Sequence, residues 1–371
     1  MNLRGGTKMA IQMHASVRVR PTRDSAGQQR WIVDHLGNRQ RFSLPVIAVM
    51  LLLVCAEPID EMAALERTGA RVTIPIKVLK QLLDNLKQKE LLILTTDSRH
   101  RNDLEHMASF ARHGWQAAWD YLLLTYNYPF VDYAENGRII DSKRMEEYGK
   151  IEPDNSRFKK SPSPLKRISL PVIEASLMSM SVGSAYKPLH HTDWGIQELC
   201  NLCAVAFGLT GIINQNQSSH TSEPLYLRTS PSMGARHPVE AYVIVQAVQG
   251  LDQGCYHVCV GDHQLDYISS ERVGSEFLST LIPELTEQWN KPPRAILLLT
   301  AVFERSMYRY REPHIFRTVH IDVGHLCASV ELIARSYGMV LEIFPFNQVL
   351  AAERLGAELL TEGGMVAVAL W

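Results

Sequence analysis

The spacing of hydrophobic residues predicts a compact unit near the start of the chain. Residues 31–42 are expected to be extended, and an apolar run over residues 45–55 predicts a buried helix. A short helix and a turn follow, and apolar residues then recur at helical spacing from Ile76 to Leu86 before a strand that begins at Glu90. A helix, a helix–turn–helix and a strand in this order are typical of a winged helix. We predict a winged-helix-like domain over residues 1–100.

The charges on its second helix bear on the partner of this domain. Winged helices suggest DNA, but the candidate recognition helix carries no arginine, and its cations are Lys77, Lys80, Lys87 and Lys89. A peptide or a protein is at least as good a partner for residues 31–98.

The next segment, residues 101–184, is expected to hold one helix and a linker. Residues 104–133 have a helical pattern, with three aromatic residues expected in the core, Trp115, Trp119 and Tyr121. Residues 134–168 are polar and charged and end in alternating Pro and Ser, which is typical of a surface loop or linker.

From residue 185 to residue 371, helices and strands interleave. We expect helices over 194–209 and 322–339, a turn at Gly254-Cys-Tyr, and four strands, over 240–248, 295–303, 341–346 and 365–371. No glycine-rich dinucleotide fingerprint and no phosphate-binding loop motif occurs, so neither a Rossmann site nor an NTPase is supported. The predicted class is α+β.

Composition narrows the choice of partner and compartment. The formal net charge is -1, which gives no support to nucleic acid or membrane binding by the whole chain. The longest apolar run, residues 44–56, is shorter than the roughly 20 residues of a membrane span, so we expect a cytoplasmic protein. Six cysteines in 371 residues form no disulfide framework. Two short-spaced cysteine pairs, Cys200/Cys203 and Cys255/Cys259, would need further ligands to bind zinc, which His190, His191 and His257 could supply. Packed thiols are favoured over zinc, and no metal is predicted.

Three blocks in the second half carry a family resemblance. The first, "RTSPSMGARHPVE", runs from Arg228 to Glu240; the second is "GCYHVCVGDHQL"; and the third runs from Arg305 through Tyr310 to Gly324. Together, and in this order, they resemble the nitroreductase superfamily and, more narrowly, the SagB-type dehydrogenases that act on ribosomally made peptides. The winged-helix-like part also resembles an extra domain of some of these enzymes.

The resemblance implies a fold, a cofactor and an assembly. It implies an FMN-binding domain with a mixed sheet flanked by helices, and a homodimer with the flavin at its interface. A Pro-Ser-x-Gly turn presents backbone groups to the flavin edge because glycine has no Cβ to block the approach. The cofactor-binding residues that it implies are His191, Thr192, Arg228, Ser230, Pro231, Ser232, Met233, Gly234, Ala235, Arg236, Arg317 and Gly324.

The chain departs from the family pattern around the phosphate. His191-Thr192 stands where relatives have Arg-Ser or Arg-Thr, Ala328-Ser329 stands where they often have Gln-Asn, and no basic tail follows. Phosphate binding is therefore expected to depend on Arg228 and Thr192, with Arg236 or Arg317, and FMN to be held weakly.

The implied catalytic pair departs as well, since azoline oxidases of this family have Lys-Tyr where this chain has Arg309-Tyr310. Arginine does not lose its proton in proteins, so Tyr310 is expected to transfer the proton. If the two side chains meet, Arg309 would lower the pKa of Tyr310. Alternatively, Arg309 pairs with a carboxylate such as Glu304 or Glu312.

The resemblance therefore implies an FMN-dependent oxidoreductase that matures a peptide. Two chemistries remain open, oxidation of an azoline to an azole and reduction of a dehydroamino acid. Two other functions also remain: a flavin-free scaffold that binds a leader peptide through residues 31–98, beside other peptide-modifying enzymes, and a DNA-binding regulator.

Overall fold

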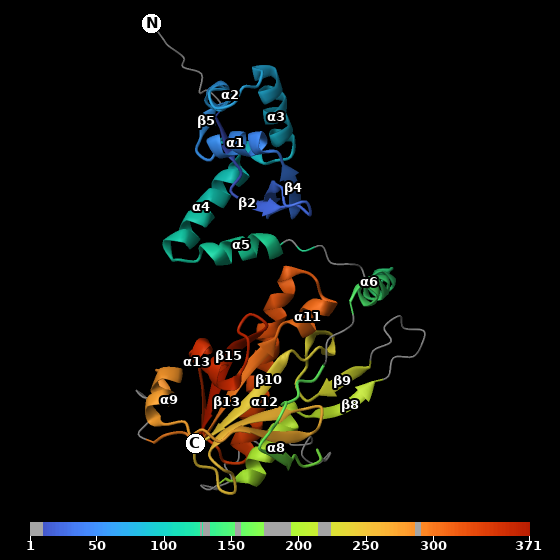
Figure 1. The fold of residues 1–371 in the computed structure, drawn as a ribbon, viewed down its shortest axis with the longest axis vertical. Coiled ribbons are helices and arrows are strands. Elements are labelled where there is room, and N and C mark those ends of the chain that lie inside the picture. The colour runs from blue at the N-terminus through green and yellow to red at the C-terminus, as the bar shows by residue number, and fades with distance from the viewer. Residues whose placement is uncertain are drawn as a thin grey trace. The chain divides into compact units, whose positions relative to one another are not determined.

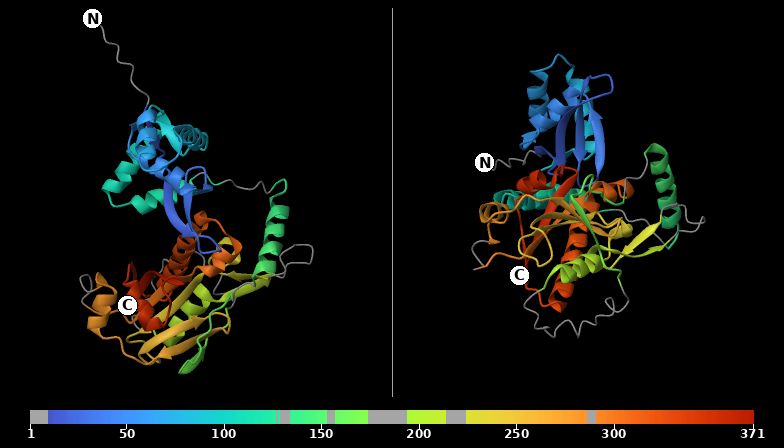
Figure 2. Two further views of the ribbon diagram at one scale, coloured as in Figure 1. Left: turned by 45° about the horizontal axis from the view of Figure 1, so that its top comes forward. Right: turned by 60° about the horizontal axis from the view of Figure 1, so that its bottom comes forward.

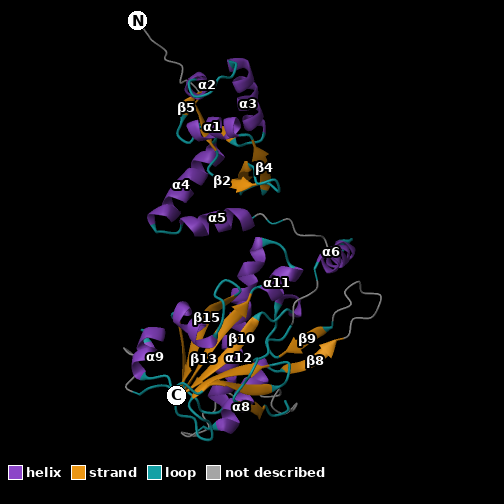
Figure 3. Cartoon of the chain, in the orientation of Figure 1, coloured by secondary structure: helices purple, strands orange, loops and turns teal. Residues whose placement is uncertain are grey.

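The computed structural model describes residues 10–126, 128, 134–152, 157–173, 194–213, 224–285 and 291–371. They fall into two compact units, Met1–Phe130 and Val131–Trp371 (Figure 1). Both units combine helices and strands, as the two further views in Figure 2 and the colouring in Figure 3 show. The predicted α+β class is confirmed.

The first unit holds the short helices that the hydrophobic pattern predicted. Its strands are β1 (Ala10–Met13), β2 (Val17–Arg23), β3 (Gln29–His35), β4 (Gln40–Leu44), β5 (Ile59–Asp60) and β6 (Leu92–Leu94). Its helices are α1 (Val46–Val54), α2 (Glu61–Gly69), α3 (Ile76–Gln88), α4 (Ser98–Arg112) and α5 (Gln116–Thr125). β1 lies between β5 and β6 in one sheet, and β3 lies between β2 and β4 in another.

Local sequence explains these helices. Asp60 caps α2, because its carboxylate accepts hydrogen bonds from the backbone N–H groups of Met62 and Ala63. In α3 the buried positions Leu79 and Leu83 fall on one face, which packs against α1 and α2 in a common core. The order α1, α2, α3, β6 is the one that the winged-helix prediction requires, and the winged-helix identification itself stays a prediction.

One helix was expected over residues 104–133, and the structure has two. Gly114 has a left-handed φ of 75°, which separates α4 from α5. Trp119 is buried, but Trp115 is 63% exposed beside this turn, so its expected place in the core is wrong.

The charged segment 134–168, expected to be a linker, contains two regular elements. They are α6 (Gly137–Ile151) and β7 (Lys166–Ser169), which pairs with β12 at the edge of the large sheet. Charged residues suit an exposed helix and an edge strand as well as they suit a loop, which is why composition alone was misleading here.

Three histidine rings lie together in the first unit. The ring centres of His14 and His35 are 4.6 Å apart, and those of His14 and His100 are 5.4 Å apart. Burial, together with the two neighbouring histidines, lowers the pKa of His14 to about 4. Burial also lowers the pKa of His35 and of His100, although Asp103 acts in the opposite direction on both. The cluster is therefore neutral at pH 7.

We expect the first unit to lose stability as the pH falls from about 6.5 towards 4. The unfolded chain binds protons at these histidines in that window while the folded chain does not, so protonation favours unfolding. Between pH 7 and pH 5 the loss is expected to be about 1–2 kcal/mol. Hydrogen exchange of the α3 amides, corrected for its intrinsic pH dependence, measures it. His14→Gln should reduce the loss, and equal protection at both pH values would contradict the expectation.

The second unit is organised around a seven-stranded sheet. The strands of this unit are β7, β8 (Leu209–Ile213), β9 (Leu225–Arg228), β10 (Val239–Val245), β11 (Gly254–Cys259), β12 (Gln264–Ser269), β13 (Ala295–Val302), β14 (Leu341–Phe344) and β15 (Glu362–Leu370). Its helices are α6, α8 (Ile196–Phe207), α9 (Ser275–Leu281), α11 (Glu304–Arg309), α12 (Phe316–Ser336) and α13 (Gln348–Leu355). The sheet order is β14-β15-β13-β10-β11-β12-β7, and β8 pairs with β9 in a separate ribbon.

The expected mixed sheet is not found, because every neighbouring pair of strands in this sheet is antiparallel. The helical connection does bring β14 back in the direction of β13, but β15 inserts between them and runs antiparallel to both. The turn expected at Gly254-Cys-Tyr is also wrong, since these residues begin β11.

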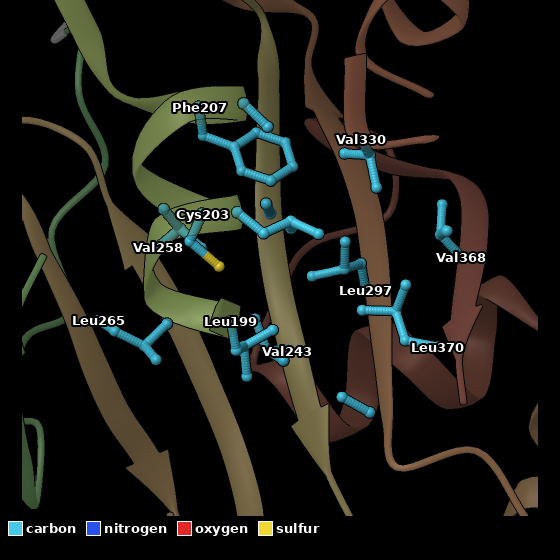
Figure 4. Packing of buried hydrophobic residues seen from close by; sticks show 14 of the residues in the cluster. Leu199, Cys203, Phe207, Val243, Val258, Leu265, Leu297, Val330, Val368 and Leu370 are labelled. Carbon is cyan, nitrogen blue, oxygen red and sulfur yellow. The ribbon is translucent and has the colours of Figure 1, made fainter. Parts of the chain in front are cut away.

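Successive side chains along each strand point to opposite faces of the sheet, so the hydrophobic core of this unit lies in two parts, one on each face. Val243 and Leu297 pack with α8 and α12, whereas their neighbours Ile244 and Ile296 pack with residues of α9 and α13. Figure 4 shows Leu199, Cys203 and Phe207 of α8 lying against the first face. Strands buried on both faces read as continuous apolar runs, as β10 and β13 do.

No helix in the described part of the chain is long and apolar enough to cross a bilayer. The apolar run near residue 50 forms the nine-residue helix α1, as expected.

Candidate functional site

The loop between β9 and β10 brings several of the predicted flavin-binding residues together. Its centre, Met233–Ala235, is a 3₁₀ turn in which Gly234 has a φ of 58° and Ala235 one of 50°. Met233 and Gly234 are exposed, whereas Arg236 and His237 that follow are buried. The turn therefore presents backbone groups to solvent directly above buried polar side chains.

Arg228 lies in a small cavity below this turn. The cavity is lined by Arg228, Ser230, Pro231, Ser232, His237, Pro238, Val239, Asp322 and Leu326. Nε of Arg228 is buried and has no hydrogen-bond partner in the described part of the chain. Burial lowers the pKa of Arg228 to about 10, although the charge of Glu240 acts in the opposite direction, so the side chain is still a cation at pH 7. A buried cation with an unpaired donor favours an anionic or oxygen-rich ligand.

The serines of the turn hold it against α12. Ser230 Oγ lies 2.6 Å from Ser329 Oγ, and Ser232 Oγ donates to Oδ2 of Asp322 at 2.6 Å. Ser232 Oγ also accepts a hydrogen bond from the backbone N–H of His237 at 2.9 Å. Burial raises the pKa of Asp322, against the hydrogen bond from Ser232. These hydroxyls therefore fix the shape of the loop.

The predicted catalytic tyrosine packs on the same turn. A Cβ on Gly234 would overlap Oη of Tyr310, so only glycine leaves room for the phenol. The guanidinium carbon of Arg309 lies 5.2 Å from the centre of the Tyr310 ring, so the two side chains meet. Arg309 Nη2 also lies 3.5 Å from Oδ2 of Asp141 on α6, so its carboxylate partner is neither Glu304 nor Glu312.

The two side chains meet, and Arg309 acts on the pKa of Tyr310 in the expected, lowering direction, but the net pKa is not lowered. Burial raises the pKa of Tyr310, and Arg309 acts in the lowering direction without reversing that effect. Tyr310 therefore carries its proton at pH 7, which suits a proton donor.

The three sequence blocks meet at a buried carboxylate. Glu240 of the first block lies 2.5 Å from Nη2 of Arg305 in the third and 2.9 Å from Nε2 of His257 in the second. All three side chains are at most 3% exposed. Burial alone would raise the pKa of Glu240, but the hydrogen bond from His257 and the charge of Arg305 hold it below its ordinary value. Arg305 also donates to the backbone oxygen of His237, which ties this cluster to the loop.

A second buried cluster adjoins the first across the sheet. Oε1 of Glu362 accepts hydrogen bonds from Tyr242 Oη at 2.8 Å and Thr300 Oγ1 at 2.7 Å. Lys159 Nζ reaches Oε2 of Glu362 at 2.5 Å, and Ser161 Oγ lies 3.1 Å from Nδ1 of His257. Residues 159–161, from the segment expected to be a linker, thus complete both clusters.

These clusters and Asp322 were not among the predicted site residues. The available signal was a polar side chain within a strand of mostly apolar residues, because Glu240 and His257 stand in β10 and β11, where every residue is buried.

Arg236, Arg317 and Gly324, which were also predicted, do not line this cavity. The Nε of Arg236 donates to the backbone oxygen of Arg305, and Arg236 lies against the ring of Tyr308, so it is engaged inside the protein. Arg317 and Gly324 are exposed on α12. His191 and Thr192 lie outside the described residues.

The cysteines are free and buried. Burial raises the pKa of Cys200 and of Cys327 to about 11, which keeps these thiols protonated. Among the residues that the structure describes, no group of His, Cys, Asp and Glu side chains converges as a metal site would require.

Comparison with known proteins gives relatives for part of the chain. No family model matches. The trifolitoxin-processing protein TfxB of Rhizobium leguminosarum bv. trifolii is 29% identical over 233 residues, 60% of this chain and 61% of that protein. A protein of Methanocaldococcus jannaschii that is named as a nitroreductase is 30% identical over 144 residues, 39% of this chain and 65% of its own length. The chain thus spans less than two thirds of each of these relatives.

Two solved structures match part of this chain with TM-scores below 0.5. A nitroreductase-like protein from Anabaena variabilis has a TM-score of 0.46 and 22% identity, and the match covers 62% of this chain and 46% of that one. The Escherichia coli microcin synthetase McbBCD complex with truncated pro-MccB17 bound has a TM-score of 0.38 and 15% identity, covering 67% of this chain and 85% of that one.

Proposed function

We propose that this chain, which is similar in sequence to a toxin-processing protein and to a protein named as a nitroreductase, is an FMN-dependent oxidoreductase of SagB type that modifies a ribosomally made peptide. The observation that carries the proposal is a buried arginine with an unpaired donor, below an exposed glycine turn that also contacts a protonated tyrosine. The relative that is named for toxin processing supports a peptide as substrate.

The chemistry of the donors fits FMN. Arg228 would contribute a charge to a ligand oxygen, and the exposed backbone of Met233 and Gly234 would contribute polar groups to the edge of a planar ring. When bound, FMN supplies a site that accepts or returns a hydride. Fixed donors near the ring favour the charge that it carries after reduction.

The residues of this chain would manage the accompanying proton. Tyr310, with its raised pKa, holds a proton at Oη and is better suited to donate it than to remove one. Arg309 and Asp141 would hold the ring of Tyr310 in place. This favours reduction of an unsaturated residue, with Tyr310 protonating carbon, over oxidation of an azoline.

For residues 31–98 we propose binding of a leader peptide or a partner protein in preference to DNA. Of the four lysines on and after α3, Lys87 pairs with Glu61, and Lys89 lies 4.8 Å from the centre of the Phe42 ring. Two lysines with intramolecular partners leave a weaker cationic surface than duplex DNA requires.

We expect the purified full chain to bind FMN, with Arg228→Ala weakening the affinity at least tenfold. A charge-assisted hydrogen bond contributes about 1.5–3 kcal/mol, which is roughly tenfold or more in affinity. Quenching of flavin fluorescence on titration measures the dissociation constant. Arg335→Ala removes an exposed arginine of α12 and serves as the matched control.

Without FMN, Arg228→Ala should leave the melting temperature unchanged or raise it, because the substitution removes a buried charge with an unpaired donor. A wild-type chain that takes up no flavin from excess FMN would refute the oxidoreductase and favour a flavin-free scaffold. A variant with unchanged affinity but a large loss of stability would assign Arg228 a structural role.

A further inference from the structure

Tyr310 also lines an apolar groove to which the glycine turn does not contribute. The groove has a volume of about 600 Å³ and is formed by α11, the Pro313–Ile315 turn, the start of α12 and Leu360. A volume of this size is typical of sites for small ligands or single side chains with their flanking backbone. Three of its apolar residues are unusually exposed: Met307 at 51%, Phe316 at 49% and Leu360 at 88%. Exposed apolar residues gathered around one hollow indicate a binding surface.

The charged residues of the groove are mostly acidic. Glu152, Glu304 and Glu312 line it, and Arg311 is the one cation among its lining residues. Arg311 is already engaged, because it pairs with Glu152 and lies 3.9 Å from the centre of the Tyr148 ring. Glu304 and Glu312 are partly buried, and their carboxylates form no ion pair or hydrogen bond with any residue that the structure describes. The groove therefore has an apolar floor and two carboxylates without a counter-charge.

We propose that this groove is the specificity site of the enzyme, and that it binds a peptide segment in which an apolar side chain is next to a lysine or arginine. The apolar side chain would cover Met307 and Phe316, and the cation would neutralise Glu304 and Glu312. An acidic segment would meet repulsion at the same two carboxylates. Because Tyr310 is one of the residues that line the groove, a segment bound there lies beside the proposed proton donor.

This proposal rests on the proposed peptide-modifying function, but binding can be measured without turnover. The test uses the full chain and two fluorescein-labelled peptides, acetyl-Lys-Phe-Lys-amide and acetyl-Glu-Phe-Glu-amide, followed by fluorescence anisotropy at low ionic strength. We expect the basic peptide to bind at least tenfold more tightly. The double variant Glu304→Gln/Glu312→Gln should lose about tenfold in affinity for it, while Glu353→Gln on α13 should not.

A separate variant tests the proposed contact with the apolar side chain of the peptide. Phe316→Ser should weaken both peptides by a similar factor, because it removes floor area without changing charge. FMN uptake is measured on the same samples, so a chain that binds the basic peptide but no FMN would retain this site while refuting the oxidoreductase. Equal binding of the two peptides, or an unchanged affinity of the double variant, would overturn the proposal. So would a Phe316→Ser variant that changes the oligomeric state and leaves peptide binding intact, since a second copy would then cover the groove.

Discussion

Tyr310→Phe is expected to keep the fold and the bound flavin and to lose turnover by about 10²–10⁴-fold, the usual contribution of a general acid or base. The substitution removes only the hydroxyl that packs against Gly234, so the ring still fills its place beside Arg309. The rate of substrate modification in single-turnover experiments measures the loss. The flavin spectrum of the same sample shows whether the cofactor site is intact.

Arg309→Lys is the companion variant, because it restores the lysine that the family resemblance would place there. If Arg309 positions the phenol through its contacts with Tyr310 and Asp141, lysine should lower the rate, since it has neither the planar group nor the reach. The pH profile separates this role from a merely structural one. The raised pKa of Tyr310 predicts a rate that falls only above pH 10, where the phenol loses its proton. Wild-type rates in both variants would show that this pair is not the catalytic centre.

Periodicity and motifs predicted the framework of the chain well. Hydrophobic patterns predicted several elements correctly: apolar runs predicted α1, β10 and β13, and helical spacing predicted α3 and α8. These patterns are regular because the elements are buried on a regular surface. The prediction of a linker over residues 134–168 was wrong because the elements in this segment are not buried in the same way. An exposed helix such as α6 and an edge strand such as β7 need little apolar surface, so their sequences read as loop.

The candidate site was predicted only in part. The Pro-Ser-x-Gly motif identified the residues that form the turn. Tyr310 contacts Gly234 in this turn, although the two are 76 positions apart in the sequence. The roles of individual side chains were beyond the sequence, since they depend on which groups come together on folding. Arg236 is engaged with a backbone oxygen, whereas Arg228, eight positions earlier, keeps an unpaired donor. The pKa of Tyr310 likewise depends on burial, which outweighs the arginine beside it in the sequence.

The second large expected effect is a loss of stability on substitution of Glu240, the residue at which the three sequence blocks meet. Glu240→Ala should destabilise the second unit by about 3–5 kcal/mol, because it leaves Arg305 as a buried charge without its carboxylate. Urea unfolding followed by intrinsic tryptophan fluorescence, to which Trp194 in the core of this unit contributes, measures the loss. Glu284→Gln removes a carboxylate that is exposed, and it should change the free energy of unfolding by less than about 0.5 kcal/mol.

Glu240→Gln distinguishes charge from shape at the same position. The amide keeps the volume and can still accept from His257, but it loses the charge that balances Arg305, so it should lie between wild type and Glu240→Ala. Because Arg305 donates to the backbone oxygen of His237, a displaced Arg305 should also disturb the loop that carries Arg228 and Gly234. FMN affinity should therefore fall in Glu240→Gln even under conditions where the chain remains folded. A variant as stable as wild type, with unchanged FMN affinity, would show that the buried carboxylate neither supports the fold nor positions the loop.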